Sequence, residues 1–122
     1  MAQKGQSGTD WLERRGISNP AILAAMRAVP RDKFYSEGGD AASSKLDGVT
    51  ITPVEVVAKM IEALNVDENS TVLQVGTGSG YAAAVLSKLA QAVFTVERDA
   101  EVGKEAQERL SELGFKNVQV LY

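Results

Sequence analysis

One short stretch constrains the fold of this chain more than any other. Residues 71–75 are mostly β-branched or apolar, as in a buried strand, and they run directly into the glycine-rich segment 76–80. Apolar residues then recur at helical spacing over residues 82–89, and a second strand-like run, residues 92–96, ends at the acid Glu97. A strand, a glycine turn, a helix, a second strand and an acid make up the nucleotide-binding half of a doubly wound α/β sheet.

Each glycine has its own task in such a turn. Gly76 lets the chain turn sharply off the strand, Gly78 lets a ligand approach the backbone, and Gly80 relieves close helix packing. Glu97, at the carboxyl end of the next strand, is placed to accept hydrogen bonds from two ribose hydroxyls. The alternative is a tight turn that holds no ligand.

The spacing of the glycines selects among nucleotides. The dinucleotide fingerprint GxGxxG/A needs a small residue where this chain has Tyr81, and the third glycine, Gly80, comes one residue early. No Gly-Lys-Ser/Thr follows, so the segment is not a P-loop. The GxGxG form suits an adenosine ligand without a pyrophosphate, which points to S-adenosylmethionine.

Composition narrows the chemistry further. The 122 residues suit one domain, and a net charge of −3 argues against recruitment of nucleic acid or anionic lipid by bulk charge. The chain contains no cysteine and no histidine, so we expect no disulfide, thiol nucleophile, histidine base or metal site. No apolar run approaches the roughly 20 residues that span a bilayer, and the N-terminus lacks a signal-peptide core. We therefore expect a cytoplasmic protein without a membrane partner.

The N-terminal third predicts a helical cap that covers one face of the sheet. Asp10 followed by Glu13 resembles a capping box at the start of a short helix. Asn19 and Pro20 open the next helix with a capping side chain and a proline in the first turn, and Pro30 ends it.

The remaining patterns define the organisation of the chain. Residues 115–122 alternate like a third strand, after a helix that Asp99 caps. We expect a flexible extension at 1–9, a helical cap with a loop at 10–49, and a Rossmann-like cofactor-binding half-domain at 50–122 with about three strands. The exposed edge of the last strand would favour a homo-oligomer or a partner chain unless it is covered.

Thr52 has two readings. With Pro53 as the first helical residue and Glu55 as the reciprocal acid, Thr52 fits the N-cap of a helix, which the spacing favours. The alternative is that its hydroxyl faces the ligand crevice. The helix itself carries an apolar stripe formed by Val56, Val57, Met60, Ile61 and Leu64.

Four segments taken together resemble the protein-L-isoaspartate O-methyltransferases, a class of Rossmann-like enzymes that use S-adenosylmethionine. Residues 16–34 are similar to the family's "GI…VL.AM..VPRE.F" segment, and residues 48–60 to "GQTIS…VA.M". Residues 72–86 are similar to "VLEIGTGSGYQAAVLA" and residues 95–98 to "TVER". The combination is far more specific than the glycines alone.

The resemblance implies methyl transfer from S-adenosylmethionine, leaving S-adenosylhomocysteine, to the side-chain carboxylate of L-isoaspartyl residues in damaged proteins. Thr52 falls where the family has a serine beside the reacting carboxylate, which implies a catalytic role for its hydroxyl. The resemblance also implies a set of cofactor-binding residues, namely Gly76, Thr77, Gly78, Ser79, Gly80, Glu97 and Arg98. Such a reaction depends on positioning and removal of water more than on an acid or base.

The chain departs from the family pattern in three places. Gln74 replaces an acid of the first strand, so its amide offers hydrogen bonds without charge. Residues 43–47 do not reproduce the family's "LPIG" loop and Val49 replaces its glutamine, which bears on substrate recognition. The sequence stops at Tyr122, before the family's Gly-Asp-Gly motif. A non-catalytic truncated module that binds an adenosyl ligand or a partner chain, and a bare structural fragment, are therefore the competing hypotheses.

Overall fold

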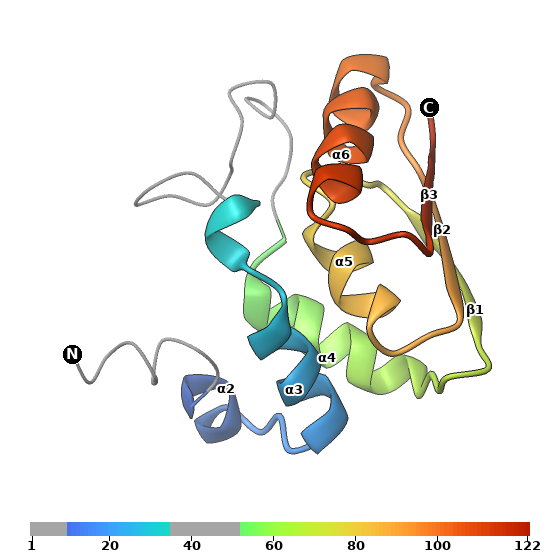
Figure 1. Cartoon of the computed structure of the whole chain (residues 1–122). Coiled ribbons are helices and arrows are strands. Elements are labelled where there is room, and N and C mark those ends of the chain that lie inside the picture. The colour runs from blue at the N-terminus through green and yellow to red at the C-terminus, as the bar shows by residue number, and fades with distance from the viewer. Residues whose placement is uncertain (1–9, 35–51) are drawn as a thin grey trace.

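The computed structural model of the chain describes residues 10–34 and 52–122 (Figure 1). The predictions made for residues 1–9 and for the loop that includes 43–49 lie outside this part. Its helices and strands follow in the order α2 (Trp11–Arg14), α3 (Pro20–Ala28), η2 (Arg31–Lys33), α4 (Val54–Leu64), β1 (Thr71–Val75), α5 (Tyr81–Ser87), β2 (Ala92–Val96), α6 (Ala100–Glu112) and β3 (Val118–Leu121).

The three strands form one parallel sheet in the order β1-β2-β3. Thr71 of β1 lies opposite Ala92 of β2, and Val96 of β2 lies opposite Leu121 of β3. Each connection between neighbouring strands carries one helix, α5 and then α6, as parallel strands require. The predicted fold class, a partial doubly wound α/β sheet with an N-terminal helical cap, is confirmed.

One face of the sheet is covered and the other is bare. Strand residues that alternate toward α5 and α6 are buried, namely Val72, Val93, Thr95, Val118 and Val120. On the opposite face Leu73 is 65% exposed and Val75 is 81% exposed. Figure 1 shows α5 and α6 on one side of the sheet and no described element on the other. Parallel sheets are normally buried on both faces, so this one is half of a complete layer structure.

The N-terminal cap packs against α5 through α3, while Phe34 anchors the segment that follows α3. The Phe34 side chain is fully buried, and its ring makes edge contacts with the rings of Tyr81 and Phe115, at centroid distances of 5.8 Å and 6.3 Å. Such pairs contribute about 0.5–1.5 kcal/mol each beyond the burial of their area. The cap is therefore held to the helix that begins directly after the glycine turn.

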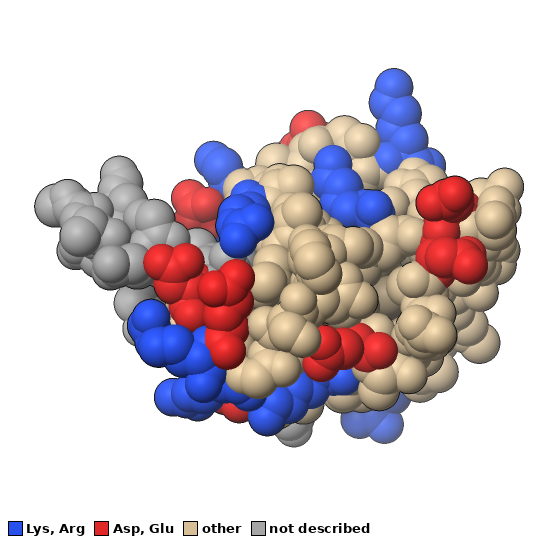
Figure 2. All heavy atoms as spheres, turned by 90° about the horizontal axis from the view of Figure 1, so that it is seen from below, with Lys and Arg blue, Asp and Glu red and all other residues tan. Residues whose placement is uncertain are grey.

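The surface carries charges of both signs. Figure 2 shows Lys and Arg side chains interspersed with Asp and Glu side chains around a broad uncharged area on the face seen from below. Within the described part of the chain, none of the helices has the length and apolar character needed to span a membrane.

Two predicted helix starts are confirmed. The Asn19 side chain accepts a hydrogen bond from the Ala21 N–H at 2.8 Å, and Pro20 is the first residue of α3. The Asp99 side chain caps α6 by accepting from the N–H of Glu101 at 3.0 Å. Both caps depend on contacts within a few residues, which is why the sequence predicts them.

Two other predicted caps are wrong. Asp10 precedes α2 in helical conformation and makes no side-chain capping bond. The helix α4 begins at Val54 with Pro53 in the capping position, so Thr52 is not its N-cap. Glu55 does not close a capping box, because its carboxylate is engaged elsewhere.

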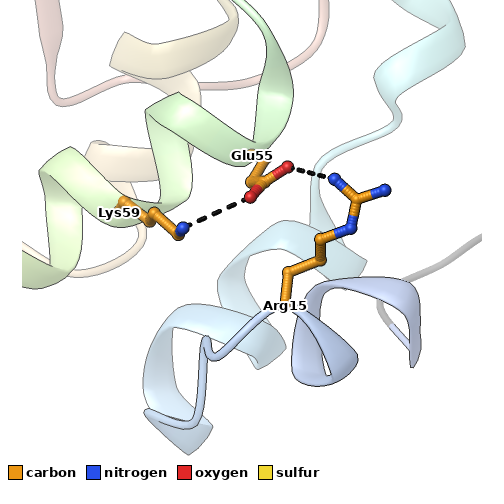
Figure 3. Close-up of polar contacts among 3 residues, drawn as sticks. All are labelled: Arg15, Glu55 and Lys59. Atoms are coloured by element: carbon orange, nitrogen blue, oxygen red, sulfur yellow. Dashed lines mark hydrogen bonds and ion pairs between the residues drawn. The ribbon is translucent and has the colours of Figure 1, made fainter.

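The Glu55 carboxylate joins α4 to the end of α2 (Figure 3). Its Oε1 accepts from Arg15 Nη1 at 2.6 Å, and its Oε2 pairs with Lys59 Nζ at 3.3 Å. The hydrogen bonds from Lys59 and then Arg15 hold the pKa of Glu55 below its ordinary value. Glu55 therefore pairs with Arg15, which lies 40 residues away in the sequence, and does not cap its own helix.

The apolar stripe predicted for α4 is only partly buried. Val57 and Ile61 belong to the core, whereas Met60 is 61% exposed and Leu64 is 54% exposed. The inner side of α4 packs against α3, while Met60 and Leu64 border an open groove beside β1.

Candidate cofactor-binding site

The glycine turn leaves the carboxyl end of β1 in a conformation that needs glycine. Gly76, Gly78 and Gly80 have φ values of 92°, 57° and 95°, in the left-handed region. A Cβ added at Gly76 or Gly78 would meet nothing within 4 Å, so both face open space. A Cβ at Gly80 would lie 3.3 Å from Leu110 Cδ1, which confirms that the third glycine permits close helix packing.

Glu97 holds the turn from the neighbouring strand. Its Oε1 accepts from the Gly78 N–H at 3.1 Å, and its Oε2 accepts from the Asp99 N–H at 3.1 Å. The Gly76 N–H also bonds to the Val96 carbonyl at 2.8 Å. Each carboxylate oxygen keeps further acceptor capacity, so Glu97 can hold the turn and still accept from a ligand hydroxyl. The structure thus brings together two of the predicted site residues, Gly78 and Glu97.

A buried chain of hydroxyls lies beneath the turn. Thr77 Oγ1 is 2.7 Å from Thr95 Oγ1, and Thr95 Oγ1 donates to Gln74 Oε1 at 2.8 Å. Thr77 is 4% exposed and Thr95 is fully buried. The Thr77 hydroxyl is therefore used to fix the turn to β2. Sequence reasoning missed Thr95, although a lone polar residue in an otherwise apolar strand was a usable signal.

Ser79 and Arg98 differ in how firmly they are held. Ser79 is 7% exposed, and its Oγ accepts from the Tyr81 N–H at 3.3 Å while its carbonyl accepts from Arg109 Nη1 at 2.8 Å. Arg98 is exposed and makes no hydrogen bond or ion pair with another residue in the described ranges. Arg109 was not predicted, because its contact with the turn spans 30 residues of sequence.

Thr52 lies across a groove from the end of β1. The groove has a volume of about 540 Å³, and its mostly apolar lining includes Thr52, Gln74 and Gly76 together with residues of α4 and α5. Thr52 is exposed, so its hydroxyl is free of any capping role and open to a ligand. In the ranges 10–34 and 52–122, no group of three or more Asp and Glu side chains is arranged to hold a metal ion.

Comparison with known proteins identifies the family. The family model for protein-L-isoaspartate(D-aspartate) O-methyltransferase (PCMT) matches residues 7–122. The chain belongs to this family. A protein-L-isoaspartate O-methyltransferase 2 of Pelobacter propionicus is 45% identical over 118 residues, and the match covers 92% of this chain and 52% of that relative.

Further PCMT relatives agree in sequence and in structure. A protein-L-isoaspartate O-methyltransferase of Rhodopseudomonas palustris (strain BisB5) is 47% identical, covering 90% of this chain and 54% of the relative. The crystal structure of a putative PCMT from Plasmodium falciparum in complex with S-adenosyl-L-homocysteine superposes with a TM-score of 0.76 at 26% identity, covering 94% of this chain and 61% of that one. The chain thus spans about half the length of the curated PCMT relatives that it matches.

Proposed function

We propose that this PCMT family member acts in S-adenosylmethionine-dependent methylation of the side-chain carboxylates of L-isoaspartyl residues in damaged proteins. The observation that carries the proposal is the pairing of Glu97 with the Gly78 N–H at the open side of the glycine turn. That arrangement leaves a carboxylate acceptor beside backbone to which a ligand has access, since no atom lies where a Cβ of Gly76 or Gly78 would stand.

The residues present fit an adenosyl cofactor. Glu97 would accept hydrogen bonds from the ribose hydroxyls, and the backbone at Gly76 and Gly78 would lie against the ligand. Thr77 and Ser79 would act by fixing the turn, while Arg98 would contact the cofactor from the exposed side. The bound cofactor supplies an activated methyl group on a sulfonium.

The remaining work of the site is to place the acceptor. Thr52 would hydrogen-bond the substrate carboxylate at the groove that also reaches Gln74 and Gly76. Its hydroxyl would orient one carboxylate oxygen toward the methyl donor, and the apolar lining would exclude water. No proton needs to be removed from a carboxylate that is already ionised at neutral pH, so the site needs no histidine.

The test is calorimetric titration of the chain with S-adenosylhomocysteine. We expect saturable binding that Glu97→Ala weakens at least tenfold, because a charged acceptor of two hydrogen bonds is lost. Glu68→Ala is the matched control, since Glu68 is exposed in the turn between α4 and β1 and lies away from the site. Equal affinity in both variants would contradict the assignment of Glu97.

Turnover is measured separately, with an isoaspartyl peptide and labelled S-adenosylmethionine. We expect Thr52→Val to lower methyl transfer while leaving S-adenosylhomocysteine affinity within about twofold, since the hydroxyl faces the acceptor and not the ribose. If the chain binds the cofactor without methylating the peptide, the cofactor site stands and catalysis belongs to a longer protein.

A second candidate is a non-catalytic module that is completed by a partner chain. The exposed apolar face of the sheet, the apolar groove along β1 and the edge position of β1 favour it, because a partner chain can cover an apolar face and pair with an unpaired edge strand. The strand order β1-β2-β3 puts β3 at one edge of the sheet, as the sequence predicted, and puts β1, with the groove beside it, at the other edge. Sedimentation distinguishes the two functions: a strictly monomeric chain that turns over the peptide would exclude the module.

Location and organisation remain part of the proposal. We place the protein in the cytoplasm, because a chain without cysteine needs no oxidising compartment. We also keep the division into an extension at 1–9, a cap with a loop at 10–49 and a cofactor-binding half-domain at 50–122. Its macromolecular partners would be isoaspartyl proteins and not nucleic acid.

A further inference from the structure

Arg109 reaches the glycine turn from the far side. It lies near the C-terminal end of α6, is half-buried, and donates from Nη1 to the Ser79 carbonyl at 2.8 Å. A guanidinium bonded to a neutral carbonyl in a partly buried place is a charge-assisted contact, stronger than a bond between two neutral groups. No ion pair competes for this guanidinium among the described residues.

This bond fixes the orientation of one peptide group. With the Ser79 carbonyl directed to α6, the N–H of Gly80 points the other way and donates to the Thr77 carbonyl at 3.0 Å. Gly80 then has the φ of 95° with which it caps α5. Rotation of the Ser79–Gly80 peptide plane would break both hydrogen bonds and change the conformation of the turn, in which Gly78 faces open space.

The packing around Gly80 shows that α6 supports the turn in a second way. Positions near Gly80 are occupied by Leu110 Cδ1 and Ala106 Cβ, at 3.3 Å and 3.6 Å from where a Cβ of Gly80 would be. Leu110 directly follows Arg109, so one stretch of α6 both packs against the turn and bonds to it. Glu97 holds the turn from β2, and Arg109 holds it from α6.

We propose that Arg109 is a positioning residue of the cofactor site, which holds the Ser79–Gly80 peptide and so keeps the glycine turn in the conformation that presents Gly76 and Gly78 to the adenosyl ligand. The inference rests on the proposed function for the identity of the ligand. The effect of Arg109 on the conformation of the turn is independent of the proposed function, because that conformation can be measured without ligand. Arg109 acts through its contact with the Ser79 carbonyl, so its role is that of a positioning residue and not a catalytic one.

The variant that tests the proposal is Arg109→Met, which keeps most of the aliphatic side chain and removes the donor. We expect the dissociation constant for S-adenosylhomocysteine to rise about tenfold, as for loss of one charged hydrogen bond. Arg109→Lys keeps a charged donor on a shorter side chain, so it should bind S-adenosylhomocysteine more tightly than Arg109→Met but less tightly than wild type. Lys104→Met is the matched control, since it removes the same charge from an exposed position of the same helix.

Hydrogen exchange of the Gly80 amide in the unliganded chain gives the second readout. We expect exchange about tenfold faster in Arg109→Met than in wild type, because the Gly80 N–H loses its acceptor, the Thr77 carbonyl, when the peptide rotates. Lys104→Met should leave the rate unchanged, and a general loss of stability would instead speed exchange in β2 as well.

The outcomes separate the two proposals. Failure of the wild-type chain to bind S-adenosylhomocysteine would overturn the proposed function and leave the exchange result to decide the role of Arg109. Unchanged Gly80 exchange in Arg109→Met, or an affinity equal to that of Lys104→Met, would overturn the role of Arg109. If Arg109→Met does not fold, Arg109→Gln takes its place, because its side chain stays polar but loses the charge and length of the arginine. Exchange and affinity in that variant equal to wild type would overturn the role.

Discussion

At the scale of single residues, the turn after β1 depends on backbone conformations and buried hydroxyls that few side chains allow. Gly80 combines a left-handed φ with a close approach to Leu110. Gly16, which follows α2, has a similar φ of 100° but faces open space. Substitutions at the two glycines therefore distinguish the cost of a left-handed backbone conformation, which both share, from the cost of crowding Leu110, which applies only to Gly80.

We expect Gly16→Ala to lower the free energy of unfolding by about 1–2 kcal/mol, the cost of a left-handed alanine. Gly80→Ala should lower it by about 1 kcal/mol more, because the added methyl group displaces Leu110. Urea denaturation measures both values. Equal losses in the two variants would show that the packing at Gly80 contributes nothing.

A further residue-scale prediction concerns the hydroxyl chain beneath the turn. Thr95→Val keeps the shape of the side chain but leaves Thr77 Oγ1 and Gln74 Oε1 without their partner. We expect a loss of about 1–3 kcal/mol in the free energy of unfolding, the penalty for unsatisfied buried polar groups. Thr71→Val, on the exposed side of β1, is the control and should change stability by about 0.5 kcal/mol or less.

At the scale of elements, local and distant contacts decide the helix ends differently. The caps at Asn19 and Asp99 were predictable because donor and acceptor lie within three residues. The start of α4 was not, since Arg15 draws Glu55 away from the capping position. The contact of Arg109 with the turn was not predictable either, because its partner lies 30 residues away in the sequence. The turn itself was predictable from its glycines, because φ is a local property.

The contact between Arg15 and Glu55 makes the joint between α2 and α4 sensitive to pH. Because the contacts hold the folded-state pKa of Glu55 below its ordinary value of 4.5, they stabilise the fold fully above pH 4.5. This stabilisation disappears as the pH falls through the folded-state pKa. We therefore expect the unfolding midpoints of wild type and Glu55→Gln to differ at neutral pH and to converge in acid.

Urea unfolding at a series of pH values checks this prediction. Glu62→Gln is the control, because Glu62 lies on the same helix and makes no ion pair within the described part of the chain; its unfolding midpoint should equal that of wild type at every pH. If the difference in unfolding midpoint between wild type and Glu55→Gln grew toward low pH, it would contradict the prediction.

At the scale of the whole molecule, the chain presents half of a layered α/β structure. The strand sequence predicted three parallel strands and their order along the chain, because alternation and length are local patterns. It did not predict that Leu73 and Val75 would be exposed, since their apolar character is that of a sheet buried on both faces.

The bare face yields a prediction on two valines. Val75→Lys should change the free energy of unfolding by about 0.5 kcal/mol or less, because the side chain is 81% exposed, and should reduce any self-association of the chain. Val93→Lys should prevent folding, since Val93 is 1% exposed and a lysine there would bury a charge against the helices. Circular dichroism and light scattering measure the two effects, and a strongly destabilised Val75→Lys would mean that this face is covered.

We propose above all that the glycine turn and Glu97 form the cofactor site. Titration of the ¹⁵N-labelled chain with S-adenosylhomocysteine, followed by amide chemical shifts, tests it most directly. We expect saturable shifts that are largest at Gly76, Gly78, Gly80 and Glu97 and absent from α2. Shifts confined to other parts of the chain, or none at millimolar ligand, would contradict it.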